Sequence, residues 1–118
     1  MHNKKLYALG RLKTGQMNRT EAAYAQHLEL QKRAGVIAWW AFDAVKLRLA
    51  ENCFLSVDFF VMTASGELQA QDVKGSKAII TDDAKIKMRV CAEKFPWPFF
   101  YAIPKPKKLG GGWDLIAI

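Results

Sequence analysis

The stretch "VDFFVMTASGELQAQDVKG", Val57 to Gly75, decides the fold, because it predicts two β-strands joined by a tight turn. Apolar and β-branched residues indicate strands at about Leu55 to Met62 and Glu67 to Lys74. Between them, Ala64-Ser65-Gly66 is typical of a three-residue turn, with Gly66 in the left-handed conformation. We therefore expect a β-hairpin at the centre of the molecule.

This hairpin also brings two acidic residues together. A turn centred on Ser65 places Asp58 directly opposite Asp72, and Lys74 shares the face of Asp72 because alternate strand residues point the same way. Opposed side chains have Cβ atoms about 5 Å apart, so two carboxylates there repel each other. A divalent cation between them is the simplest way to offset the repulsion, since Mg²⁺ prefers oxygen ligands.

The simpler alternative is a pair of solvent-facing acids on an edge hairpin, with Lys74 as their ion-pair partner. The residues expected to share the faces of the two acids are apolar: Phe54, Phe60, Leu68 and Ala70. Such a face is at least partly covered, and acids beside it are costly unless they are paired or bound to a metal. This pattern favours a functional interpretation of the acids.

A helix is predicted upstream, from about Arg19 to Ala34. Asn18 is a good N-cap, and Glu21 lies three residues later, as in a capping box. Helical spacing also puts Glu21 on the stripe of Ala25 and Leu28, which we expect to pack on the sheet. Judged from the residues alone, helix capping is the better explanation of Glu21.

The remaining elements complete a mixed sheet. "VIAWWAF", "VKLRLAENCF", "FFYAI" and "GWDLIAI" each predict a strand. "TDDAKIKMRVCAEKF" predicts a second helix capped by Thr81, with an apolar stripe of Ala84, Met88, Cys91 and Phe95. The expected fold class is α/β (mixed α+β), a central mixed β-sheet flanked by two helices.

Size and charge set broader limits. The 118 residues predict one domain spanning 1–118, with residues 1–17 as a basic N-terminal arm. Eighteen Lys and Arg against eleven Asp and Glu leave a net charge of +7. This excess fits either a polyanion partner such as nucleic acid or simply a soluble basic surface. No apolar run approaches the roughly 20 residues of a membrane span, and no signal-peptide core is present, so we expect a cytoplasmic protein without membrane contact.

The cysteines do not predict a metal site or a disulfide framework. Cys53 and Cys91 stand apart, without the spacing of metal ligands, and are interpreted as two buried thiols. Only His2 and His27 accompany them, which argues against a Cys/His zinc site.

"VDFFV" followed by "QDVKG" resembles the motif of the PD-(D/E)XK nuclease superfamily, with Asp58, Asp72 and Lys74 in the motif positions. The expected element order also resembles the αβββαβ core of that superfamily. From about Met17 to Phe99 the chain resembles small phage and prophage proteins. The spacing is similar to that of phage endonuclease I type Holliday junction resolvases, which carry a Glu in the first helix, matched here by Glu21.

The match to the motif has two departures. Val57 stands where the motif usually has Pro, which shapes only the entry to the strand. Asp72 stands where the nearest relatives have Glu, which the superfamily permits.

The resemblance implies a metal-dependent DNA endonuclease. Asp58 and Asp72 would hold Mg²⁺, or Mn²⁺, with the backbone carbonyl of Val73. Lys74 would orient the attacking water or stabilise the transition state. Glu21 would complete a second metal site or act as general base. With this resemblance in view, Glu21 joins Asp58, Asp72 and Lys74 as an expected catalytic residue.

The resemblance also points to a substrate, branched DNA such as a Holliday junction, and to a symmetric homodimer, since resolving a junction needs two cuts. The expected DNA-binding residues are Lys85, Arg89, Lys105, Lys107 and Lys108. For Lys85 and Arg89 a solvated helix face is an equal alternative. Trp39, Trp40 or the run "FPWPFFY" would supply a dimer interface, although aromatic residues more often serve the core.

Two other functions remain open from the sequence. One is a nicking or end-processing nuclease with the same site. The other is a non-catalytic DNA-binding protein that keeps a nuclease fold.

Overall fold

The computed structural model describes residues 15–118. The elements in chain order are α2 (Arg19–Arg33), β1 (Ile37–Phe42), β2 (Lys46–Ala50), β3 (Cys53–Ser56), β4 (Phe59–Thr63), β5 (Leu68–Val73), the 3-10 helix η1 (Lys77–Ile79), α3 (Asp82–Lys94), β6 (Phe99–Pro104), the 3-10 helix η2 (Lys107–Leu109) and β7 (Trp113–Ala117). The expected basic arm, residues 1–17, lies outside the described residues except for 15–17.

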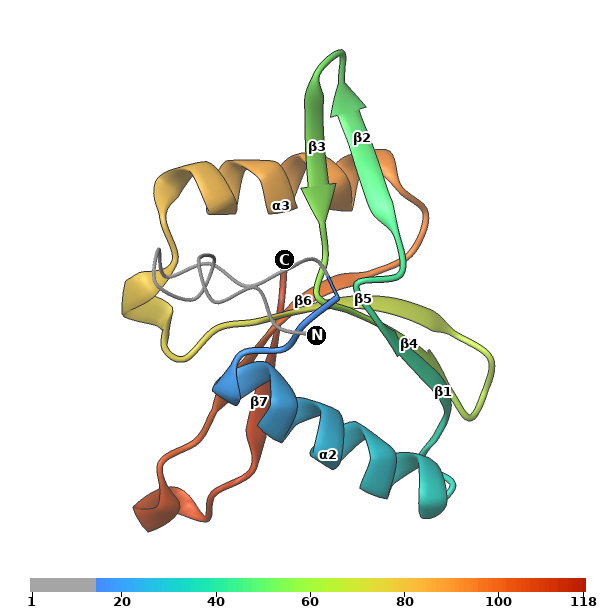
Figure 1. The fold of residues 1–118 in the computed structure, drawn as a ribbon, viewed down its shortest axis with the longest axis vertical. Coiled ribbons are helices and arrows are strands. Elements are labelled where there is room, and N and C mark those ends of the chain that lie inside the picture. The colour runs from blue at the N-terminus through green and yellow to red at the C-terminus, as the bar shows by residue number, and fades with distance from the viewer. Residues whose placement is uncertain (1–14) are drawn as a thin grey trace.

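The main sheet has five strands in the order β1-β4-β5-β6-β7. β5 and β6 are parallel, and the other neighbours are antiparallel. A parallel pair needs a crossover connection, and α3 provides it. α2 and α3 lie on opposite faces of this sheet (Figure 1). The predicted fold class, a mixed sheet flanked by two helices, is confirmed.

α2 covers one face of the sheet. Asn18 caps it by accepting a hydrogen bond from the Glu21 backbone N–H, and the Glu21 carboxylate accepts one from the Asn18 N–H, which confirms the predicted capping box. The buried residues of this face form one cluster: Tyr24, Ala25, Leu28, Ile37, Phe59, Val61, Val73 and Ala102. Burial of this apolar stripe is what stabilises α2 in water.

α3 and the β2–β3 hairpin cover the other face. The Thr81 hydroxyl caps α3 by accepting from the Ala84 backbone N–H. The cluster beneath contains Leu47, Val57, Phe60, Ala70, Met88, Cys91, Phe99, Tyr101 and Ile103. Met88 and Cys91 are buried, and Ala84 and Phe95 are half-buried, so the predicted apolar stripe of α3 is confirmed.

The sequence-based strand assignment was wrong upstream of Asp58. "VKLRLAENCF" is not one strand but most of the β2–β3 hairpin, because Asn52 turns the chain at a φ of 57°. The strand expected from Leu55 to Met62 is also interrupted, since β3 ends at Ser56, β4 starts at Phe59, and the two strands belong to different sheets.

This break moves Phe54 away from the acids. Phe54 lies on β3 with 40% of its surface exposed, and the Lys46 ammonium sits 4.8 Å from the centre of its ring. The expectation that Phe54 shares a covered face with Asp58 is therefore wrong. The expectation for Phe60 agrees with the structure, because Phe60 is buried in the cluster under α3.

Two further expectations concern cysteines and membranes. Cys91 is buried and Cys53 only half-buried, so the prediction of two buried thiols holds for Cys91 alone; neither forms a disulfide. Within residues 15–118, no helix combines the length and apolar character needed to span a bilayer.

Candidate active site

The site lies where β4 and β5 stop pairing. The last backbone-paired residues are Phe59 and Gln71, and the turn at the other end has Gly66 at a φ of 93°. This is the predicted register, and it puts Asp58 opposite Asp72 just beyond the last pair. Asp58 immediately precedes β4 and Asp72 lies near the end of β5, so both carboxyl groups sit where the two strands begin to separate.

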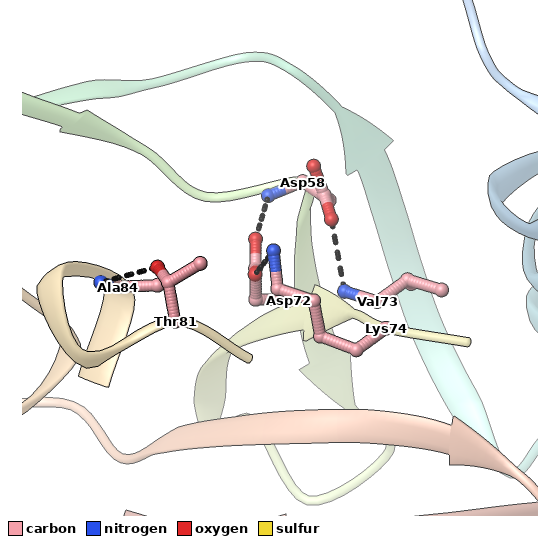
Figure 2. A network of polar contacts seen from close by, with 6 residues as sticks. All are labelled: Asp58, Asp72, Val73, Lys74, Thr81 and Ala84. Atoms are coloured by element: carbon pink, nitrogen blue, oxygen red, sulfur yellow. Dashed lines mark hydrogen bonds and ion pairs between the residues drawn. The ribbon is translucent and has the colours of Figure 1, made fainter. Parts of the chain in front are cut away.

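Side chains replace the backbone ladder at this point. The Asp58 backbone N–H donates to Asp72 Oδ1 across 3.4 Å, and the Val73 backbone N–H donates to Asp58 Oδ2 across 2.9 Å (Figure 2). Each carboxyl group thus accepts a hydrogen bond from the opposite strand. We call this exchange the carboxylate clasp. It fixes both acids relative to the backbone of the sheet.

Lys74 completes the group. Its Nζ lies 3.2 Å from Asp72 Oδ2, and the side chains of Lys74 and Asp72 are 29% and 10% exposed (Figure 2). Burial alone would lower the pKa of Lys74, but the charge and hydrogen bond of Asp72, helped by Asp58, outweigh it and leave the pKa raised. Lys74 is therefore a fixed positive charge beside the acid pair.

Asp58 carries the strongest electrostatic penalty. Burial and the charge of Asp72 raise its pKa to about 9, and the hydrogen bond from the Val73 N–H offsets only part of that rise. A carboxyl group with this pKa keeps its proton at neutral pH unless a positive charge comes close. Without a metal ion, Asp58 is therefore the acid that holds a proton.

Glu21 acts on Asp58 only electrostatically. It is half-buried, it raises the pKa of Asp58 through space, and its carboxylate accepts a hydrogen bond from the Asn18 backbone N–H at 2.8 Å. The structure thus brings together three of the four expected catalytic residues, with Glu21 near them but engaged in the helix cap.

The donor set suits a cation that keeps much of its water. Among residues 15–118, no cluster of three or more His, Cys, Asp or Glu side chains could hold a metal ion. The available oxygens are those of Asp58 and Asp72, together with the carbonyl of Val73, the residue whose N–H donates to Asp58. Mg²⁺ is commonly held by one or two carboxylates plus waters, so these residues fit it.

Four of the five expected DNA-binding residues are exposed, and the five lie in two places. Lys85 and Arg89 are on the outer side of α3. Lys107 and Lys108 are in η2, while Lys105 is half-buried and pairs with Asp114 across 3.8 Å. Because β5 and β6 are parallel, the segment that carries η2 leaves the sheet at the same edge as Lys74.

One residue near the acids was not predicted. Tyr101 on β6 is the parallel partner of Asp72 on β5, and its hydroxyl is buried without a hydrogen-bond partner. The sequence "FFYAI" is typical of a core strand, so it gave no reason to single out Tyr101. Only the parallel pairing of β5 with β6 places it beside the site.

The aromatic residues considered for a dimer interface have different environments. Trp39 on the edge strand β1 is 44% exposed. Trp40 donates from its indole nitrogen to Glu29, and Trp97 packs against Phe60 and other rings of the core. Core packing therefore accounts for the run "FPWPFFY", and Trp39 remains the exposed candidate.

The chain matches no protein-family model, no curated protein and no solved structure.

Proposed function

We propose that this protein is a metal-dependent DNA endonuclease that hydrolyses phosphodiester bonds. The observation that carries the proposal is the clasped pair Asp58 and Asp72, with Lys74 held 3.2 Å from Asp72. The buried Asp72 faces the half-buried Asp58, whose pKa is raised, and this arrangement is an unfavourable element of a small fold. A divalent cation would make this arrangement favourable, since both carboxylates would ligate it.

Each residue of the site would have a distinct role in this reaction. Bound Mg²⁺ would stabilise charge on the phosphate oxygens and lower the pKa of a ligated water. Asp58 and Asp72 would hold the cation, together with the carbonyl of Val73. Lys74 would place its ammonium where negative charge develops in the transition state, and its fixed position means that little reorganisation is needed.

Glu21 would assist from the start of α2. Its charge already acts on Asp58, and it is half-buried rather than fully solvated. A shift of the side chain away from the Asn18 N–H would let it bind a second metal or accept a proton from water. The Asn18 carboxamide would still cap the helix in that arrangement.

Branched DNA is the proposed substrate and a homodimer the proposed assembly. The net charge of +7 and the exposed basic residues near η2 and on α3 favour binding to phosphates. Contacts of this kind fix a protein on DNA without reading the base sequence. Two cuts across a junction need two sites, which a twofold dimer supplies.

The proposal is tested by incubating the protein with a four-way junction, a linear duplex and a single strand, each with Mg²⁺, Mn²⁺ or EDTA. We expect paired cuts in the junction with either metal and none in EDTA. Cuts confined to one strand or to DNA ends would identify a nicking or end-processing enzyme with the same site. Absence of cleavage on all three substrates with both metals would refute the endonuclease proposal.

One observation favours a second candidate, a non-catalytic DNA-binding protein. The ion pair between Lys74 and Asp72 already neutralises one acid without a metal. In that case the junction would be bound equally well in Mg²⁺ and in EDTA, and no substrate would be cut.

A further inference from the structure

The hydroxyl of Tyr101 is an anomaly beside the site. It is buried, and it has no hydrogen-bond partner within the described structure. Buried hydroxyl groups almost always find a partner, because burying one without a hydrogen bond is unfavourable. An orphaned hydroxyl therefore calls for an explanation, and its position suggests one.

Tyr101 lies next to Asp72 and Lys74. It faces Asp72 across the parallel β5–β6 pair, where neighbouring strands are about 4.8 Å apart. Both residues point to the α3 side of the sheet. Tyr101 belongs to the cluster under α3, as does Ala70, which lies two positions before Asp72 on the same strand. The charges of Asp72 and Lys74 also act on the pKa of Tyr101, which burial raises.

Occupation of the acid pair by a cation would change the partners of Lys74. In the present structure the Lys74 ammonium is held by Asp72 Oδ2. A cation on the same carboxylate repels the ammonium and takes up lone pairs that Lys74 now uses. Lys74 has three donors, no acceptor and a flexible stem, so it needs another acceptor to keep its place.

We infer that Tyr101 is a positioning residue, whose hydroxyl oxygen accepts a hydrogen bond from Lys74 when a divalent cation occupies Asp58 and Asp72. The hydroxyl would then hold the ammonium toward the scissile phosphate. This inference rests on the proposed function, and it assigns a role to a residue outside the motif. It also explains why the hydroxyl has no partner here, since its partner is still engaged by Asp72.

Two matched substitutions separate this role from a structural one. Tyr101→Phe removes the orphaned hydroxyl on the α3 side, whereas Tyr24→Phe removes a buried hydroxyl on the α2 side that donates to Gln71. Without metal, we expect Tyr101→Phe to melt at or above the wild-type temperature and Tyr24→Phe to melt below it. With Mg²⁺ alone and no DNA, the rise in melting temperature should be smaller in Tyr101→Phe than in the wild type or Tyr24→Phe.

Cleavage kinetics provide the second readout. Tyr101→Phe should lower kcat about tenfold with KM unchanged, as expected for the loss of one hydrogen bond that orients Lys74. Tyr24→Phe should cut at the wild-type rate. In a Lys74→Ala background, Tyr101→Phe should cause no further loss, because the residue through which it acts is gone.

The outcomes are distinct. If Tyr101→Phe matches the wild type in kcat and in its response to Mg²⁺, the inference is overturned while the endonuclease proposal stands. An equal loss of rate in the presence and absence of Lys74 would also overturn it, because Tyr101 would then act independently. A wild-type protein that neither responds to Mg²⁺ nor cuts DNA would remove the proposed function and the inference together.

Discussion

The two faces of the central sheet differ in how well their polar side chains are paired. Under α2, a continuous chain of hydrogen bonds runs from Glu67 through Gln69 and Gln71 to Tyr24. Under α3, two acids face each other, and the Tyr101 hydroxyl has no partner among the described residues. The satisfied face is built for stability. The α3 face keeps an acid with a raised pKa, Asp58, despite the ion pair between Lys74 and Asp72, and such groups are often found at functional sites.

The largest expected effect is that of Asp58→Asn, which should abolish cleavage and stabilise the metal-free fold. An Asn side chain can still accept from the Val73 N–H, so the clasp is retained, and folding no longer requires a proton on residue 58. The gain at neutral pH should exceed about 1 kcal/mol, since one pKa unit corresponds to about 1.36 kcal/mol. Urea unfolding in EDTA measures the gain, and the junction assay in Mg²⁺ measures the loss of cleavage.

The pH dependence of that stability has a defined sign. Folding raises the pKa of Asp58 to about 9, so the folded protein keeps the Asp58 proton at pH values where the unfolded chain has lost it. The stability associated with this proton is fully present below the unfolded pKa of 3.8. It falls as the pH rises and is lost once the pH has passed through about 9. The wild-type protein should therefore lose more stability between pH 5 and pH 9 than Asp58→Asn does. Parallel curves for the two proteins would mean that Asp58 is not the strained acid.

Lys74→Ala should reduce cleavage by about 10²–10³-fold, the typical cost of removing one group that stabilises transition-state charge. Junction affinity should stay close to that of the wild type, because Lys74 is bound to Asp72 rather than exposed. Lys77→Ala, which removes an exposed lysine of η1, is the matched control and should cut normally. Equal rates for Lys74→Ala and Lys77→Ala would exclude Lys74 from the chemistry.

Glu21→Gln distinguishes the cap from catalysis. A Gln side chain can still accept from the Asn18 N–H, so the melting temperature should not change. If Glu21 is catalytic, the cleavage rate should fall about 10²-fold, the lower end for a general base. Glu29→Gln on the same helix, which accepts a hydrogen bond from Trp40, is the control and should stay active. A Glu21→Gln protein that cuts at the wild-type rate leaves only Asp58, Asp72 and Lys74 in the site.

Gln71→Ala tests the satisfied face. Gln71 is only 2% exposed, and its loss leaves the Tyr24 hydroxyl buried without an acceptor. The free energy of unfolding should fall by about 1–3 kcal/mol, the cost of such an orphaned group, with little change in the cleavage rate of the folded protein. Chemical denaturation and a rate measured well below the melting temperature separate the two quantities. A stable but inactive Gln71→Ala would show that the two faces are not independent.

The smallest expected effect is that of the surface lysines. Replacing both Lys107 and Lys108 by Ala should weaken junction binding several-fold and reduce the slope of affinity against salt by about 2, or about 1 for each phosphate contact. Lys32→Ala on α2 is a control on another exposed surface. An unchanged salt slope would place the DNA elsewhere on the molecule, with Lys85 and Arg89 as the next residues to replace.

Local sequence patterns were sufficient to predict the elements that carry the acids. The capping residues Asn18 and Thr81 start their helices as predicted, because side-chain caps depend on a few neighbouring residues. The position of Gly66 set the hairpin turn, which in turn fixed Asp58 opposite Asp72. These features could be predicted because no distant part of the chain alters them.

The features that could not be predicted from the sequence depend on contacts between distant segments of the chain. The β2–β3 hairpin depends on an Asn in a left-handed conformation, which is less obvious than a glycine turn, and its packing against α3 joins distant segments. The position of Tyr101 depends on β6 pairing in parallel with β5 through the α3 crossover. Nothing local to Tyr101 indicates either partner, so only the folded chain shows that it lies beside Asp72.

The carboxylate clasp also makes the Val73 amide proton a built-in reporter. This proton is held by Asp58 Oδ2 rather than by a backbone carbonyl, so its exchange with solvent and its chemical shift depend on what else that carboxyl group binds. A proton, a cation or an empty site would each leave a different signature at one backbone position. Nuclear magnetic resonance of this single amide would thus follow the state of the acid pair in solution, without DNA.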